Sequence, residues 1–195
     1  MSDTKSRIVE AALETLKADG FAGTSARAIA KRGGFNQALI FYHFGTLTDL
    51  LLAALDRTSE QRMAKYADAV KNIDSVADAV SVATELYRED LASGHITVLT
   101  ELIAGSLDRP DLGPQIVSRM EPWIGLTEEA VGKAMGSLGI ADLVPPRTVA
   151  YAIVSLYLGV DMLSHLEKDH AKAEAMFASA QQLAGVLSTI GGRDA

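Results

Sequence analysis

Apolar side chains along this chain recur every three to four residues, which is the spacing of one face of an α-helix. Near the N-terminus, Ile8, Ala12 and Leu16 lie four residues apart. Their stripe predicts an amphipathic helix over residues 6–18 that buries one face. Gly20 is predicted to end this helix, because glycine readily leaves the helical conformation.

Two short helices are predicted next. Thr24 and Ser25 offer N-caps to the first of them, which runs from about Ser25 to about residue 32. The glycine pair at 33–34 is predicted to break that helix, and the second short helix is expected at about 36–41. The chain therefore begins with three helices, of which two are short.

Longer helices are predicted for the rest of the chain, and Thr46 is expected to cap the first of them. Pro122 is expected either to kink a helix or to begin its second half. The predicted ranges are about 46–71, 75–92, 95–107, 115–138, 146–167 and 171–190. We therefore predict an all-α protein of about nine helices, with a three-helix head over residues 1–48 and a larger helical body over residues 49–195.

Composition excludes several classes of protein. The 195 residues are 48% hydrophobic, which is enough for a substantial core, and they include no cysteine. Disulfide scaffolds, thiolate zinc sites and cysteine nucleophiles are therefore excluded. The first ten residues are polar, and no stretch approaches the roughly 20 apolar residues of a membrane span. We expect a cytoplasmic protein with no membrane partner.

The formal net charge of −7 is unevenly distributed. Residues 1–50 hold six Lys and Arg against five Asp and Glu, a net charge of +1, so residues 51–195 carry −8. An acidic body with a less acidic head is compatible with a protein that approaches phosphate groups by one end.

One spacing in the head indicates a candidate function. Gly34 follows Ala30 by four residues, and Ile40 lies six residues further on. A helix-turn-helix needs a small residue where its two helices approach, a glycine where the chain turns, and an apolar residue on the second helix. An ordinary helical hairpin would fit the same three positions, so the spacing alone leaves that alternative open.

The wider segment at 24–44 resembles the DNA-binding signature of the TetR family of repressors. The similarity covers about residues 6–55 and has three parts. These are a Thr-Ser cap before an Arg-x-Ile-Ala helix, the glycine turn, and the aromatic run at 41–44 before a leucine-rich helix. The resemblance implies a transcriptional regulator, commonly a repressor, whose second short helix enters the major groove of operator DNA.

The resemblance also implies roles for individual residues. Base edges would be read from the start of the recognition helix, by Asn36, Gln37, Ala38 and Leu39. Phosphates would be held by Ser25, Arg27, Tyr42 and His43, and packing within the head is the alternative for the last two. Phe41 and Phe44 are expected in the core. Gln37 and Leu47 are uncharged where the family often has lysine or another polar residue, which predicts weaker and less salt-sensitive binding.

A homodimer on an inverted-repeat operator is the expected assembly, because one short helix reads DNA weakly. The last two helices offer apolar stripes with small residues that permit close packing in a four-helix bundle. The candidate dimer residues are Ile153, Val154, Tyr157, Asp161, Ala180, Leu183 and Leu187. The alternative is that these faces pack only within the subunit.

A pocket for a small effector between the body helices is a further implication of the resemblance. Aromatic residues and methionine make adaptable apolar walls, which suggests an apolar or aromatic effector that releases the DNA. The candidate lining residues are Tyr66, Tyr87, Leu99, Ile103, Met120, Trp123, Ile124 and Tyr157. For each of them, plain core packing is the alternative.

Two other classes of function compete with this reading. Glu167 and His170 have the Glu-x-x-His spacing of di-iron bundles, but such a site needs the motif twice. Asp161, His165 and Asp169 share a helix face that could bind a metal, although a solvated or interface face is the simpler interpretation. We therefore predict no cofactor, no metal and no enzyme activity. A helical interaction protein whose head no longer binds DNA is the third possibility.

Overall fold

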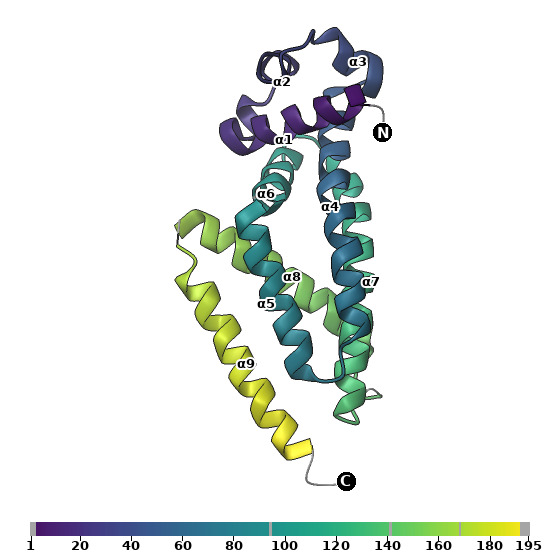
Figure 1. Ribbon diagram of the computed structural model, residues 1–195, viewed down its shortest axis with the longest axis vertical. Helices are drawn as coiled ribbons and strands as arrows, with labels where there is room; N and C mark the ends of the chain where they lie inside the picture. The colour runs from purple at the N-terminus through teal and green to yellow at the C-terminus, as the bar shows by residue number, and fades with distance from the viewer. Residues whose placement is uncertain (1–2, 94, 141, 168, 192–195) are drawn as a thin grey trace. The chain divides into compact units, whose positions relative to one another are not determined.

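The structure is a computed structural model that describes residues 3–93, 95–140, 142–167 and 169–191 (Figure 1). Over these residues the chain forms nine helices and no strand, which confirms the predicted all-α class. The helices are α1 (Asp3–Gly23), α2 (Ala26–Gly33), α3 (Ala38–Phe44), α4 (Leu47–Lys71), α5 (Val76–Ser93), α6 (His95–Ser106), α7 (Leu112–Ser137), α8 (Pro146–Glu167) and α9 (Ala171–Gly191).

The chain divides into two compact units. The first contains Met1–Arg62 and Ser93–Arg119, and the second contains Met63–Ala92 and Met120–Ala195. In the first unit α1 packs against both α2 and α6. The apolar stripe predicted on α1 is the centre of this packing, since Ile8, Ala12 and Leu16 are completely buried.

The first helix is longer than its pattern predicts. Gly20 leaves the helical conformation as expected (φ 67°, ψ 179°), but the chain resumes helical turns on the other side and continues to Gly23. Glycine adopts such a positive φ without the steric cost that a Cβ would bring. The result is a kinked end of α1 rather than a free loop before α2.

The second short helix begins and ends later than predicted. Asn36 stands before α3, where its Oδ1 accepts a hydrogen bond from the backbone N–H of Ala38 at 2.9 Å. Asparagine competes with the helix for backbone groups in this way, which favours a turn at its own position. The helix ends at Gly45, whose φ is 79°. The aromatic run at 41–44 therefore lies inside α3.

Two predicted helix starts are confirmed by their caps. Thr46 Oγ1 accepts a hydrogen bond from the N–H of Asp49 at 3.0 Å, one residue before α4 begins. Ser75 Oγ does the same for the N–H of Asp78 at 3.1 Å, at the start of α5. Each bond satisfies a donor that the first helical turn would otherwise leave without a partner. Pro122 lies inside α7, which runs through it.

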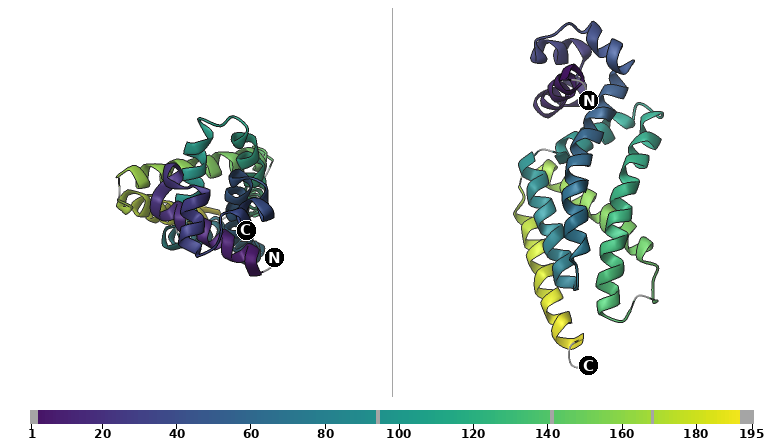
Figure 2. Two further views of the ribbon diagram at one scale, coloured as in Figure 1. Left: turned by 90° about the horizontal axis from the view of Figure 1, so that it is seen from above. Right: turned by 45° about the vertical axis from the view of Figure 1, so that its right-hand side comes forward.

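The second unit contains α5, α8 and α9, with α9 running beside α5 (Figure 1 and Figure 2). Its core includes Tyr87, Ala173 and Phe177. The Lys133 ammonium on α7 donates to the carbonyls of Val70 and Lys71 at 2.9 and 2.8 Å. A lysine at this position satisfies the last carbonyls of α4 and opposes the negative end of its dipole.

Among the described residues, no single helix is long and apolar enough to cross a membrane. Among these residues only α3 and α4 taken together have the length and composition of a membrane span, and a bend of 69° separates the two helices.

Candidate DNA-binding site

The local geometry of α2 is set by a cap at each end. Ser25 is extended (φ −130°, ψ 159°), and its side chain accepts from the N–H of Ala28 at 3.2 Å. At the other end Gly34 adopts the left-handed conformation (φ 67°, ψ 37°), and its N–H bonds the carbonyl of Ala30. Both terminal features match the sequence prediction, and together they fix where α2 begins and where the chain turns.

The three positions that suggested a helix-turn-helix come together as the motif requires. Ala30 and Ile40 are both buried in the first unit, and Gly34 lies at the turn between α2 and α3. Gly33 adds a constraint that the sequence pattern did not show. A Cβ on Gly33 would lie 2.2 Å from the Phe35 ring and 2.8 Å from Ala11 Cβ, so close packing also requires glycine here.

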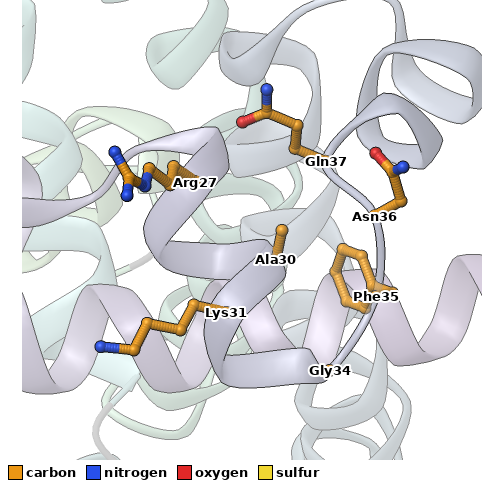
Figure 3. A pocket seen from close by; sticks show the side chains of 7 residues that line it. All are labelled: Arg27, Ala30, Lys31, Gly34, Phe35, Asn36 and Gln37. Atoms are coloured by element: carbon orange, nitrogen blue, oxygen red, sulfur yellow. The ribbon is translucent and has the colours of Figure 1, made fainter.

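An open hollow of about 500 Å³ lies along this turn. Figure 3 shows Arg27 and Lys31 on the α2 side and Asn36 and Gln37 across from them. The hollow is lined by Arg27, Ala30, Lys31, Gly34, Phe35, Asn36 and Gln37. Two cations and two amides around one concave surface are suited to anionic and hydrogen-bonding ligands such as a nucleic acid backbone and base edges.

Lys31 was missing from the predicted DNA contacts. It follows Arg27 by four residues, so both cations lie on the same face of α2, and this spacing was the signal that could have identified it. Arg32 on the same helix is used differently, since its guanidinium pairs with Asp19 on α1 at 2.8 Å. The cationic face of α2 is therefore formed by Arg27 and Lys31.

The predicted base-reading residues surround the start of α3. Asn36, Gln37 and Ala38 are exposed, and Leu39 is half-buried. Gln37 is the residue that precedes the helix and carries no side-chain cap. Its amide is available for a base edge, whereas the Asn36 oxygen is already used by the Ala38 N–H.

Two aromatic residues on α3 face solvent. Tyr42 is 82% exposed, which argues against the alternative that it packs inside the head. Its ring meets the half-buried His43 ring edge-on at 4.9 Å. The expectation that Phe41 is a core residue is wrong, because Phe41 is 49% exposed. Position 41 directly follows the buried Ile40 in α3, and successive helical residues point about 100° apart, so Phe41 is turned away from the buried side.

The eight predicted effector residues are divided between the two units. Leu99 and Ile103 on α6 belong to the first unit, whereas the other six belong to the second. In the second unit the Tyr87 ring lies 4.9 Å from the Phe177 ring and 6.2 Å from the Tyr157 ring. Tyr66, Tyr87 and Ile124 are buried, and Met120, Trp123 and Tyr157 are half-buried.

The aromatic cluster around Tyr87 has an acidic surrounding. Burial raises the pKa of Tyr87, and the negative charges of Asp161 and Glu174 raise it further. The Tyr87 hydroxyl lies 3.3 Å from Ser164 Oγ, and the Tyr157 hydroxyl donates to the Asp90 carboxylate. Tyrosine hydroxyls normally find such partners when their rings are buried. Tyr87 and Tyr157 thus tie α5 to α8 within the second unit.

The predicted dimer residues fall on two different faces. Asp161 is only 2% exposed, so it faces the interior of the second unit and does not belong to an exposed surface. Val154, Tyr157 and Ala180 are half-buried. The exposed apolar residues of α8 and α9 are Tyr151, Ile153, Leu156, Met162, Leu163, Leu166, Leu183, Val186 and Leu187.

The sequence prediction missed the three exposed leucines on α8. Leu156, Leu163 and Leu166 follow one another at intervals of seven and three residues, which was a detectable helical stripe. Of the predicted dimer residues on α8, Asp161 is buried, Val154 and Tyr157 are half-buried, and Ile153 is exposed. Because α8 is apolar on more than one side, its sequence does not distinguish the buried stripe from the exposed one.

The metal-binding alternatives found no support in the described part of the chain. No group of three or more histidine, aspartate or glutamate side chains there is placed to hold a metal ion. The His165 side chain lies outside the described residues. Glu167 pairs with Lys172 at 2.5 Å, and His170 Nδ1 lies 3.5 Å from the Tyr87 hydroxyl, which gives both residues of the di-iron motif other contacts.

A capped helix, a left-handed glycine turn and an exposed second helix, carried on an all-α chain, define a helix-turn-helix DNA-binding protein. Residues 8–54 match the model of the bacterial regulatory proteins of the tetR family. This matched segment is the DNA-binding part of such regulators, and the chain is a DNA-binding transcriptional regulator.

Relatives and solved structures agree over nearly the whole chain. The regulator UidR of Escherichia coli (strain K12) is 23% identical over 189 residues, which are 97% of this chain and 92% of UidR. A TetR transcription regulator from Haloarcula marismortui has a TM-score of 0.77 at 20% identity, covering 95% of this chain and 98% of that one. FadR from Bacillus subtilis, solved with stearoyl-CoA, has a TM-score of 0.76 at 16% identity, covering 91% and 96%. At these identities the structures share the fold.

Proposed function

We propose that this regulator binds an inverted-repeat operator as a homodimer, acts as a repressor, and releases the DNA when a small apolar or aromatic effector binds. The observation that carries the DNA part is the hollow along the α2–α3 turn, with its two cations and two amides. We place the functional boundary between the DNA-binding head and the rest of the chain at residue 48, in the first turn of α4.

The head divides its contacts by chemistry. Arg27 and Lys31 hold phosphates from α2, and Ser25, Tyr42 and His43 add contacts on either side of them. Such contacts fix the register on the duplex without reading its sequence. Gln37 reads an adenine edge through its amide, and Ala38 and Leu39 meet thymine methyl groups. Asn36 holds the turn through its bond to Ala38 and has its amide nitrogen left for the DNA.

The exposed apolar face of α8 and α9 supports the homodimer. Among the described side chains of these two helices, nine large apolar residues are exposed, which is more than the scattered single residues that a monomer surface carries. A two-fold pairing of this face brings two heads to two half-sites about one DNA turn apart, or a multiple of it. Ile153, Leu183 and Leu187 are the predicted dimer residues on this exposed face.

An aromatic cluster in the second unit supports the proposed class of effector. The rings of Tyr87, Tyr157 and Phe177 form an apolar and polarisable cluster in the second unit, which suits an aromatic or apolar molecule. FadR, which shares the fold, was solved with stearoyl-CoA, a ligand with a long apolar chain. Release of DNA requires that the effector bind one conformation of the protein more tightly than the other.

The test is selection of bound sequences from a random duplex pool with the purified protein at moderate salt. Enrichment of an inverted repeat with half-sites about one turn apart is the expected result. Enrichment of a single half-site would contradict the dimeric part of the proposal. A folded protein that enriches no sequence would favour an interaction protein whose head does not bind DNA.

A further inference from the structure

Glu101 lies on α6, outside the helix-turn-helix, and its carboxylate binds the backbone of Phe21 in the kinked end of α1 that leads into α2. The backbone N–H of Phe21 donates to Glu101 Oε2 at 2.6 Å. Phe21 directly follows Gly20, where α1 leaves the helical conformation. Donors beside a helix break need acceptors from outside the helix, and a charged acceptor gives a stronger bond than a neutral one.

A second residue of α6, Gly105, contacts the side chain of the same Phe21. A Cβ on Gly105 would lie 2.4 Å from the Phe21 ring, so the absence of a side chain lets this ring rest against the helix backbone. Gly105 follows Glu101 by four residues, which places both on one face of α6. This face therefore holds Phe21 by its backbone N–H and by its ring, within the first unit.

Two hydrogen bonds connect Gly20 and Phe21 to the start of α2. The Thr24 N–H donates to the Phe21 carbonyl at 3.1 Å, and Thr24 Oγ1 donates to the Gly20 carbonyl at 2.6 Å. The next residue, Ser25, is the N-cap of α2. The position of Phe21 thus sets the position of Ser25 and, one turn of helix further on, of the cationic face of α2.

We propose that Glu101, together with Gly105, is a positioning residue for DNA recognition: α6 sets where the α2 N-terminus meets the phosphate backbone. Glu101 touches no DNA and acts through Phe21 and Thr24. The proposal rests on the proposed DNA-binding function of the head. It predicts that substitutions on α6 weaken operator binding through lost phosphate contacts rather than through loss of folded protein.

The experiment measures operator affinity at several salt concentrations for full-length E101A, E101Q and G105A, using the operator obtained by selection with the wild-type protein. E101A should bind about tenfold more weakly, as expected for the loss of a charge-assisted bond. Its salt dependence should also be shallower by about one phosphate contact per head. E101Q should retain affinity close to that of the wild type, because its amide oxygen can accept the same hydrogen bond.

The G105A variant distinguishes a displaced Phe21 from a loss of folded protein. Alanine favours the interior of a helix over glycine, so α6 itself is not weakened, while the new methyl group must displace the Phe21 ring. G105A should therefore lose affinity and salt dependence like E101A, and its thermal midpoint, measured beside its affinity, shows that the protein remains folded at the temperature of the titration. D108A is the matched control: Asp108 is an exposed acid just beyond α6, and its removal makes the same change in net charge as E101A.

Wild-type affinity and salt dependence in both E101A and G105A would overturn the proposal. So would a loss in E101Q as large as in E101A, because the hydrogen bond would then not be what matters. If the wild-type protein itself enriches no operator, the proposed function fails and this proposal fails with it. A wild type that binds beside unaffected variants contradicts the positioning role alone.

Discussion

The α2–α3 turn and the exposed apolar face of α8 and α9 depend on different physical requirements. At the two ends of α2, Ser25 caps the start of the helix, Gly34 supplies the left-handed conformation of the turn, and Gly33 leaves room for a ring. Each position tolerates very few residues. The face of α8 and α9 requires only that several side chains be apolar and exposed. Small substitutions should therefore damage the turn, whereas only a change of polarity should damage the face.

The strongest test of this contrast is a pair of charges on the apolar face. The double substitution Leu183→Glu and Leu187→Glu should convert the dimer to monomers, because like charges would meet across the two-fold axis. Operator affinity should fall about a thousandfold as specific binding declines toward non-specific binding. Analytical ultracentrifugation and operator titration measure both effects.

The matched control is Leu183→Met and Leu187→Met, which keeps the face apolar. It should remain dimeric, because interfaces tolerate apolar exchange of similar volume. A glutamate variant that stays dimeric at the wild-type concentration would show that the partner surface lies elsewhere.

The cations of the hollow should give the next largest effect. Arg27→Ala with Lys31→Ala should lower operator affinity about a hundredfold at moderate salt, since each head loses two phosphate contacts. The plot of log affinity against log salt should become shallower by about four for a dimer. Lys17→Ala, which removes an exposed cation from α1, serves as a control for net charge. Equal salt dependence of operator binding in the wild type and the double variant would show that these two cations do not contact DNA phosphates.

The two neighbouring glycines should fail for different reasons. Gly33→Ala should destabilise the protein by about 2 kcal/mol, because its Cβ meets the Phe35 ring and Ala11. Gly34→Ala should cost about 1 kcal/mol, because there is open space around it but its φ is positive. Chemical denaturation measures both values.

A second substitution distinguishes the two causes. Phe35→Leu should be less harmful in the Gly33→Ala background than in the wild type, since a smaller side chain relieves the clash. It should add independently to Gly34→Ala. If Phe35→Leu changed the stability of both glycine variants equally, the steric explanation for Gly33 and the conformational explanation for Gly34 would be contradicted.

The smallest expected effect is at the α2 cap. Ser25→Ala should lower stability by about 1 kcal/mol, because the N–H of Ala28 loses its acceptor. Ser25→Asp should preserve stability, since aspartate caps equally well, but it should weaken DNA binding by repelling phosphate. Thermal unfolding and operator titration of the two variants should therefore rank them in opposite orders.

The comparison also explains what could be predicted from the sequence. Helix boundaries at Thr46 and Ser75 follow from caps, which are local, and they were predicted. The second short helix was expected from about residue 36, but Asn36 forms an Asx turn with the N–H of Ala38, so α3 begins two residues later.

Tertiary contacts explain the remaining differences. Asp161 lies on an apolar helix with several similar faces, and only packing against α5 and α9 decides which face is buried. The contact from Glu101 to Phe21 spans 80 residues, so no local pattern could reveal it. The division of the candidate effector residues between two units likewise depends on the fold of the whole chain.

The central claim, that the hollow on α2 and α3 faces DNA in a two-fold dimer, is tested most directly by site-directed DNA cleavage. The chain has no cysteine, so Gln37→Cys supplies a unique attachment site for an iron chelate that cleaves nearby DNA. The account predicts two clusters of cleavage related by two-fold symmetry about the operator centre, and none from Ser179→Cys on the exposed surface of α9. Cleavage from Ser179→Cys but not from Gln37→Cys would contradict it.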